Sequence, residues 1–221
     1  MPQLKRMLIV TLIGALAGSV VAFWYVRRAP APAAVPPAAS GNPTDATGSR
    51  KTKEVPLVLP DFTLASLEGP PKALSSFKQP VLLVNFWATW CAPCRREIPL
   101  LRKLRAERGA KGLEVVGIAV DFREDVVKYA AQIGLDYPLL IGEEDGLAAA
   151  DQFGVDAVFP FTAFADAQRR LVALKVGELH PEEASFILDR VEKLNAGNLT
   201  IEVARQEIRA ELTRLAAARG N

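Results

Sequence analysis

The feature that most constrains the fold is a pair of cysteines, Cys91 and Cys94, placed shortly after a near-continuous apolar run at Val81–Trp87. A short apolar run without polar alternation is typical of a central strand that is covered on both faces. The residues after Cys91 predict a helix over Ala92–Arg108, because apolar side chains recur there at helical spacing. The cysteines are therefore expected at a strand-to-helix junction in a domain where helices pack on a sheet.

The rest of the chain continues this alternation of apolar runs and helical patterns, which indicates an α/β domain. After the first helix we expect a strand, then an inserted helix, strand and helix, then a hairpin that turns at Asp166–Arg169, and a last helix that begins at Pro181. The expected ranges are 113–120, 124–133, 137–141, 145–153, 162–165, 171–176 and 181–194.

The N-terminal residues 1–28 predict a membrane anchor. Met7–Val26 holds twenty residues without a charge, which is the length that spans a bilayer as a helix. Trp24 and Tyr25 lie at its far end, where such rings favour the membrane interface. A cleaved signal peptide is the alternative, because Ala29–Pro30–Ala31 resembles a cleavage site. Basic residues flank both ends of the span, so the positive-inside rule gives little information about its orientation.

Two further segments flank the expected domain at 55–195. Residues 29–54 are rich in Pro and Ala with little apolar bulk, which predicts a flexible linker. Residues 196–221 predict an amphipathic C-terminal helix that Thr200 can cap. This helix is expected to dock on the domain, and a role in dimerisation or partner binding is the alternative.

Composition excludes several classes of function. The 27 basic and 25 acidic residues nearly cancel, and no basic cluster with aromatics suggests nucleic-acid binding. Two cysteines and one histidine cannot form a four-ligand zinc site of Cys and His, so no metal site is expected. A haem-attachment motif needs His directly after the second cysteine, where this chain has Arg95. We interpret His180 as a helix-capping or surface residue.

The spacing of the cysteines points to thiol chemistry. A sulfur at a helix N-terminus lies near unpaired backbone N–H groups, which stabilise the thiolate that attacks disulfides. Cys91 is the expected attacking thiol, and Cys94, one turn later and more buried, is the expected resolving thiol. A structural disulfide, an unpaired core thiol and a metal-binding pair are the alternatives. The only redox group that this chemistry requires is the Cys91–Cys94 disulfide itself, so no cofactor is expected.

The segment Asn85–Arg95, with the letters NFWATWCAPCR, resembles the active site of the TlpA/ResA-type thioredoxin-like proteins, which are membrane-anchored thiol:disulfide oxidoreductases. The resemblance also includes Pro60–Leu64, Val115–Asp121, Phe153–Val155 and Pro160–Thr162, so it covers roughly residues 55–195. It implies a thioredoxin-like fold, a mixed sheet flanked by helices. It also implies disulfide exchange with exported proteins and re-reduction by a membrane electron donor.

The resemblance also assigns site residues. Cytoplasmic thioredoxins are expected to carry a buried Asp where this chain has Asn85, and the Cys-x-x-Cys-x-x-Glu pattern points to Glu97 as the acid/base instead. The alternative for Glu97 is an ordinary glutamate that faces solvent. Pro160 resembles the family's cis-proline opposite the cysteines, with a trans turn proline as the alternative. Trp90, Pro93 and Phe159 are the expected substrate-docking residues, whereas Trp87 is expected in the core.

The leading functional hypothesis is the reduction of disulfides in exported proteins, such as apocytochrome c or copper-site proteins, outside the bacterial inner membrane. The soluble domain is then expected in the periplasm or at the cell exterior. Two alternatives stay open. A peroxiredoxin-like peroxidase would need a proline where Val84 stands. A non-enzymatic copper(I)-binding module would use the two thiols as ligands.

Overall fold

The computed structural model describes residues 54–156 and 158–220, which belong to a compact unit from Lys51 to Asn221. The predicted anchor at 1–28 and nearly all of the predicted linker at 29–54 lie outside these residues. In the part of the chain that is described, no helix combines the length and the apolar character needed to cross a bilayer.

A mixed seven-stranded sheet forms the centre of the unit, with the strand order β2-β1-β5-β4-β3-β6-β7. The central β3 pairs in parallel with β4 and antiparallel with β6, and every one of its residues is buried. This confirms the expectation of a central strand covered on both faces. The strands are β1 Thr63–Ser66, β2 Lys72–Ala73, β3 Val81–Trp87, β4 Leu113–Val120, β5 Leu139–Gly142, β6 Phe161–Ala165 and β7 Leu171–Val176.

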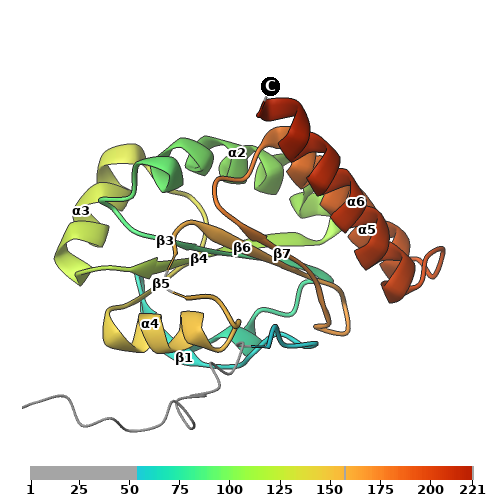
Figure 1. Cartoon of the computed structure of the whole chain (residues 1–221). Helices are drawn as coiled ribbons and strands as arrows, with labels where there is room; N and C mark the ends of the chain where they lie inside the picture. Colours follow the sequence, from blue (N-terminus) through green and yellow to red (C-terminus); the bar gives the residue numbers. More distant parts are fainter. Residues whose placement is uncertain (1–53, 157, 221) are drawn as a thin grey trace, which may run out of the picture. The chain divides into compact units, whose positions relative to one another are not determined.

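Helices cover both faces of the sheet (Figure 1). Four of them, α2, α3, α5 and α6, lie on one side, and α4 lies on the other side together with the segment that carries β1. The bounds are α2 Ala92–Arg108, α3 Arg123–Ile133, α4 Glu144–Asp151, α5 Pro181–Asn195 and α6 Ile201–Arg219, with short 3-10 turns at Leu74–Ser76 and Gly109–Lys111.

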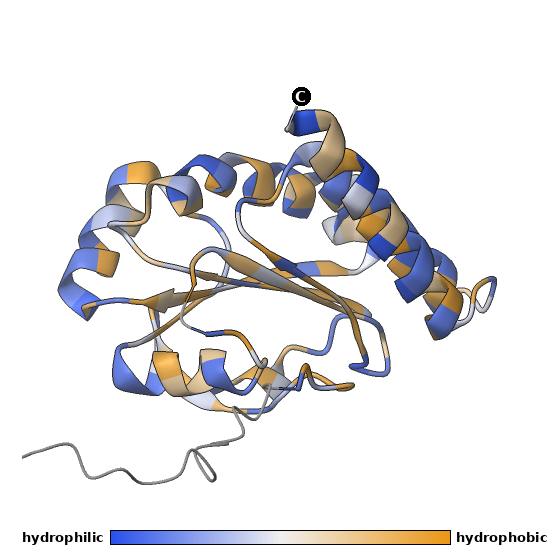
Figure 2. Cartoon of the chain, in the orientation of Figure 1, coloured by the Kyte–Doolittle hydropathy of each residue, from blue (hydrophilic) through white to orange (hydrophobic). Residues whose placement is uncertain are grey.

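The sheet separates two apolar clusters, and the alternation of side chains along β3 assigns residues to each. Leu83 and Trp87 point into the cluster under α2, α3 and α5. Val84 and Phe86 point into the cluster under α4, where the rings of Phe86 and Phe161 stack with centroids 4.4 Å apart. In Figure 2 the central strands are coloured mostly apolar, whereas the helices carry both apolar and polar residues.

Apart from shifts of one residue at the ends of other elements, three details differ from the sequence-based expectations. Strand β5 begins at Leu139 rather than at residue 137, since Pro138 has no N–H group to donate to a neighbouring strand. Helix α4 ends at Asp151 rather than at residue 153, ahead of Gly154, whose φ of +73° is left-handed. The short strands β1 and β2 were not expected, because they are too brief to show a period.

The C-terminal helix docks on the domain. Thr200 caps α6 by accepting a hydrogen bond from the Val203 amide at 3.4 Å, as predicted. Ala204 and Ile208 are buried against α5 and β7. The docked arrangement is therefore the one observed for α6.

Candidate active site

Cys91 and Cys94 lie at the start of α2 and are joined by a disulfide. Cys91 is the N-cap residue of the helix, and its sulfur accepts a hydrogen bond from the Cys94 amide at 3.3 Å. Cys91 is 5% exposed and Cys94 is fully buried, which is the expected order of accessibility. Because Cys91 Sγ receives a helix N-terminal N–H group, the fold supplies the feature that stabilises a thiolate there.

Glu97 lies one helical turn after Cys94 on the buried side of α2, with only 2% of its surface exposed. Its Oε1 accepts a hydrogen bond from Asn85 Nδ2 at 2.7 Å, and its Oε2 accepts one from the Leu179 amide at 2.7 Å. The solvent-facing alternative for this glutamate is therefore wrong. Burial raises the pKa of Glu97 to about 7, against the lowering effect of these two donors.

Asn85 connects Glu97 to the neighbouring strand. Its amide nitrogen also donates to Thr162 Oγ1 at 3.0 Å, so β3, β6 and α2 are joined by one buried polar cluster. The Asn85 Oδ1 atom has no hydrogen-bond partner among the described residues. An amide at this position holds the carboxyl of Glu97 without titrating itself, which leaves Glu97 as the titratable group of the cluster.

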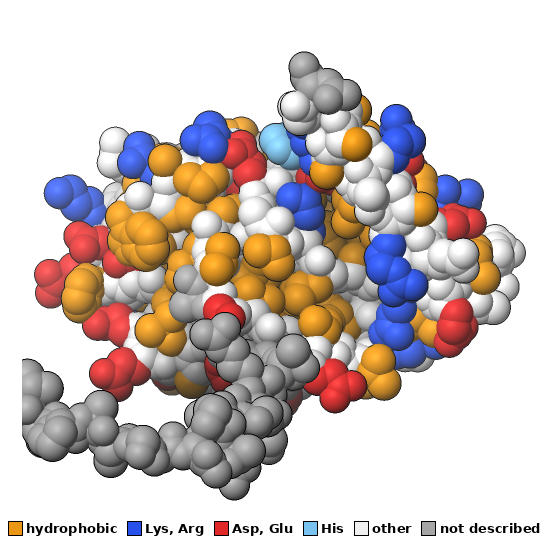
Figure 3. All heavy atoms as spheres, viewed as in Figure 1, with side chains coloured by type: hydrophobic (Ala, Val, Ile, Leu, Met, Phe, Trp, Pro, Cys, Tyr) orange, Lys and Arg blue, Asp and Glu red, His pale blue; other side chains and the backbone are white. Residues whose placement is uncertain are grey.

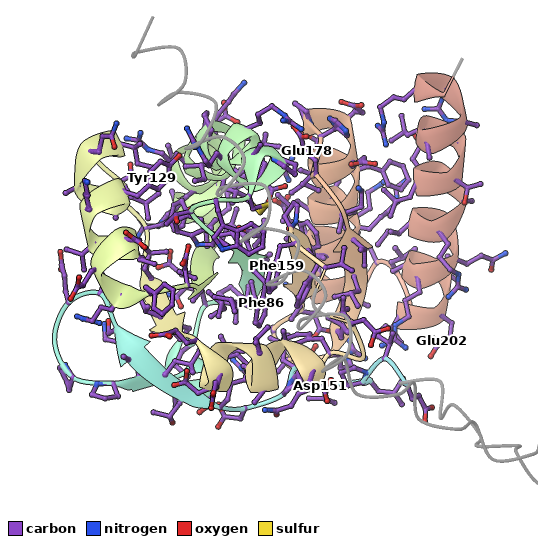
Figure 4. The ribbon with its side chains drawn as sticks, turned by 60° about the vertical axis from the view of Figure 1, so that its left-hand side comes forward. Phe86, Tyr129, Asp151, Phe159, Glu178 and Glu202 are labelled. Atoms are coloured by element: carbon purple, nitrogen blue, oxygen red, sulfur yellow. A yellow bond between two sulfur atoms is a disulfide. The ribbon has the colours of Figure 1, made fainter. Side chains whose placement is uncertain are left out.

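Charged groups beyond this cluster act on Glu97 from the end of β7, which carries Lys175, and from the loop between β7 and α5, which carries Glu178. The charge of Glu178 raises the pKa of Glu97, and that of Lys175 lowers it. Arg96 donates to both carboxylate oxygens of Glu178 in a bidentate ion pair, and these hydrogen bonds lower the pKa of the Glu178 carboxyl. Figure 4 shows the disulfide in yellow between the labels of Glu178 and Phe159.

An aromatic rim forms beside the cysteines. Trp90 precedes Cys91 and is 69% exposed, and its ring packs edge-on against Phe159, with centroids 6.4 Å apart. The peptide bond from Phe159 to the buried Pro160 is cis, which rules out the trans alternative. Pro93 lies in the first turn of α2 and is half-buried.

Phe122, which the sequence did not indicate, is a further exposed aromatic residue, and it directly follows β4 and Asp121. The carboxylate of the preceding Asp121 accepts hydrogen bonds from the Thr89 amide and hydroxyl at 2.8 and 2.6 Å. These bonds tie the loop that carries Trp90 to the end of β4. Figure 3 shows that apolar side chains gather over one face of the domain.

Sequence reasoning also missed Thr162 and the Leu179 amide, which reach Asn85 and Glu97 from β6 and from the loop before α5. No motif marks them, because they are distant in the chain from the cysteines. His180 is the N-cap residue of α5, and its amide donates to Glu183 Oε2 at 3.0 Å, in agreement with its interpretation as a capping residue. Within residues 54–156 and 158–220, no three His, Cys, Asp or Glu side chains group as metal ligands would.

Comparison with protein families matches residues 57–196 to the AhpC/TSA family. The thiol-disulfide oxidoreductase ResA of Geobacillus thermodenitrificans (strain NG80-2) is 30% identical over 133 residues, which span 60% of this chain and 75% of that protein. The thioredoxin-like protein YneN of Bacillus subtilis (strain 168) is 34% identical over 134 residues, spanning 59% of this chain and 76% of that protein.

Solved structures show the same fold. A secreted thiol-disulfide isomerase from Corynebacterium glutamicum superposes with a TM-score of 0.55 at 34% identity, covering 62% of this chain and 85% of that one. A putative thiol:disulfide interchange protein DsbE from Chlorobium tepidum gives a TM-score of 0.56 at 25% identity, covering 65% and 99%. Both similarities support a thioredoxin-like α/β fold with a mixed sheet for this chain.

Proposed function

Since the chain belongs to the AhpC/TSA family and is a thiol-disulfide oxidoreductase of the TlpA/ResA type, we propose that it reduces disulfides in exported proteins. The observation that carries this proposal is the Cys91–Cys94 pair at the start of α2, with the Cys94 amide on Cys91 Sγ. Candidate substrates are apocytochrome c and the cysteines of copper sites.

The reaction begins from the dithiol form. The Cys91 thiolate attacks one sulfur of the substrate disulfide, forms a mixed disulfide and releases the other substrate sulfur as a thiolate. Cys94 then loses its proton and attacks Cys91, which releases the second substrate thiolate and forms the Cys91–Cys94 disulfide. Two electrons pass to the substrate, which leaves as a dithiol after protonation. A membrane dithiol donor returns two electrons to the pair.

Glu97 is the proposed proton acceptor for Cys94. The carboxyl lies one turn along α2 from this cysteine, and burial raises its pKa to about 7, close to a neutral working pH. The substitution Glu97→Gln removes the titration and keeps the shape. It should slow disulfide exchange and shift its pH profile, whereas the alkylation of Cys91 should be unchanged. Unchanged exchange kinetics between about pH 5 and pH 9 would remove Glu97 from the mechanism.

Substrate docking is assigned to the rim of Trp90, Pro93 and Phe159, with Pro160 presenting the adjacent backbone. A large exposed ring beside Cys91 favours an apolar residue next to the substrate cysteine. The backbone next to a cis-proline can pair with an extended segment of the substrate.

The proposed location is the outer side of a bacterial inner membrane, with the domain in the periplasm or at the cell exterior. Support comes from the uncharged segment Met7–Val26 and from the solved relative that is described as secreted. A fusion of a topology reporter to the C-terminus would test this location, because activity of a reporter that works only in the cytoplasm would contradict it.

Trapping with Cys94→Ser tests the function directly. Without the resolving thiol, Cys91 should remain in a mixed disulfide that can be isolated from the bacterial envelope and identified by mass. The matched control is Cys91→Ser, which should trap nothing. If Cys94→Ser captures no protein and the wild-type chain fails to reduce a model disulfide, the reductase proposal is wrong. Copper(I) binding without disulfide turnover would favour the metal carrier, and turnover of a hydroperoxide would favour the peroxidase.

A further inference from the structure

The C-terminal helix α6 lies beyond residue 196, where the match to the family ends, yet it is attached to the domain at several points. Arg205, near its start, donates to the Leu171 carbonyl oxygen at 2.6 Å, and Glu207 binds Arg190 of α5. At its other end, Arg219 binds Glu182 and the buried Glu183 in the first turn of α5. The last turn of α6 is thereby fixed to the element that follows the Leu179 amide.

Glu183 connects Arg219 of α6 to Lys175 of β7. Its carboxylate is 1% exposed and pairs with Lys175 Nζ at 3.6 Å in addition to Arg219. A buried carboxylate is costly unless it is paired, so Glu183 should hold both cations firmly. The position of Lys175 therefore depends on a contact that α6 shares.

Lys175 in turn holds the peptide that binds Glu97. Its Nζ donates to the Glu178 carbonyl oxygen at 2.9 Å, and the N–H group of the same peptide, on Leu179, donates to Glu97 Oε2 at 2.7 Å. A cation on the carbonyl oxygen of a peptide polarises it and makes its N–H group a stronger donor. This stronger donor stabilises the ionised form of Glu97 more than the protonated form.

We propose that Lys175 is a positioning residue for Glu97. We also propose that α6, through Arg219 and Glu183, determines how strongly Lys175 binds the Glu178–Leu179 peptide. The C-terminal helix then adjusts the proton affinity of the group assigned as the base. This inference rests on the proposed role of Glu97 only for its effect on catalysis, because the contact chain is independent of that role.

Other groups that face Glu97 must be considered in any test that depends on pH. Glu178 acts from the loop before α5, and Tyr137, whose pKa is raised by burial, acts from the segment before β5. Cys94 shares α2 with Glu97, and His180 neighbours Glu178. In the oxidised protein the two cysteines do not contribute to the titration curve, because a disulfide does not titrate.

The experiment is a carbon NMR titration of the Glu97 side-chain carboxyl in the oxidised full-length chain. Lys175→Met should raise its titration midpoint by about one pH unit, and Arg219→Ala should raise it by about half a unit. Arg219→Lys keeps a cation and should restore most of the wild-type midpoint. The matched control is Arg214→Ala, which removes a cation of the same helix that pairs only locally with Glu211 and should leave the midpoint unchanged.

A second variant protects the test against simple loss of structure. Glu183→Gln removes the buried anion that competes for Lys175, so Lys175 should bind the Glu178 carbonyl oxygen more strongly. The titration midpoint of Glu97 should then fall, which is the opposite of the change expected for Arg219→Ala. Equal midpoints in wild-type, Arg219→Ala and Glu183→Gln proteins, or shifts of the same sign in both variants, would overturn the proposal. If the midpoints move as expected but Glu97→Gln leaves exchange kinetics unchanged, the positioning chain stands and the assigned role of Glu97 fails.

Discussion

Replacing Glu97 by Gln should change how the stability of the domain depends on pH. The wild-type carboxyl has a pKa raised to about 7 in the folded chain by burial, against 4.5 for the ordinary side chain. Between these values the folded protein holds a proton that the unfolded chain has released. The free energy of unfolding therefore decreases as pH rises from about 4.5 to about 7, and the effect is complete above that range.

The size of the effect follows from the shift. A pKa difference of this size corresponds to about 3 kcal/mol in total, most of which is lost between pH 5 and pH 8. Glu97→Gln should abolish this loss, because the introduced amide does not titrate. Asn85 can adapt to the change by turning its amide, so that the free Oδ1 atom accepts from the new N–H group.

Urea unfolding of the oxidised protein, followed by tryptophan fluorescence, measures the difference. With a urea dependence of about 2 kcal/mol per M, the wild-type midpoint should fall by about 1 M from pH 5 to pH 8 relative to that of Glu97→Gln. The carboxyls of Asp61, Glu178, Glu182 and Glu211 have lowered pKa values, so their contributions are lost on the acid side of this window. Parallel stability curves for the two proteins from pH 5 to pH 8 would refute the reasoning.

Three further substitutions probe the rim and the core. Trp90→Ala should raise KM by about tenfold for a disulfide peptide that has an apolar residue beside its cysteine, while kcat changes little. Steady-state kinetics measures both constants, and an unchanged KM would show that Trp90 does not dock the substrate. Gly117→Ala should cost about 1–3 kcal/mol in urea unfolding, because the added methyl meets Tyr137 Cε2 at 3.0 Å and Trp87 Nε1 at 3.2 Å. Phe86→Ala should cost about 3–5 kcal/mol in the same assay, since its ring is fully buried against Phe153 and Phe161; a loss below 1 kcal/mol would contradict this packing.

The order of the central elements could be predicted from local patterns. The unbroken apolar run of β3, the helical spacing of α2 and the capping Thr200 of α6 each carry their signal within a few residues. The cysteines are equally local, because their spacing and their place at a helix start are visible in the chain. The resemblance supplied Glu97 and Pro160, and the structure adds that the former is buried and the latter follows a cis bond.

The contacts that surround Glu97 could not be predicted in this way. Thr162 and the Leu179 amide come from elements more than sixty residues away along the chain, and only the pairing of β3 with β6 and the docking of α5 bring them to Asn85 and Glu97. The ion pairs of Lys175, Glu183 and Arg219 have the same origin. A charged residue in a sequence does not reveal its partner when tertiary packing determines it.

The two borders of the sheet have a consequence for a thiol-disulfide oxidoreductase whose proposed substrates bind as extended segments. An exposed border strand can recruit the extended segments of other molecules and begin aggregation. Here β2 at one border has only two residues, and β7 at the other has its Leu171 carbonyl bound by Arg205 and its Val176 carbonyl bound by Lys175. Cationic side chains thus occupy backbone acceptors that a foreign strand would need. A proposed substrate segment can then reach the thiols while the sheet resists extension by that segment.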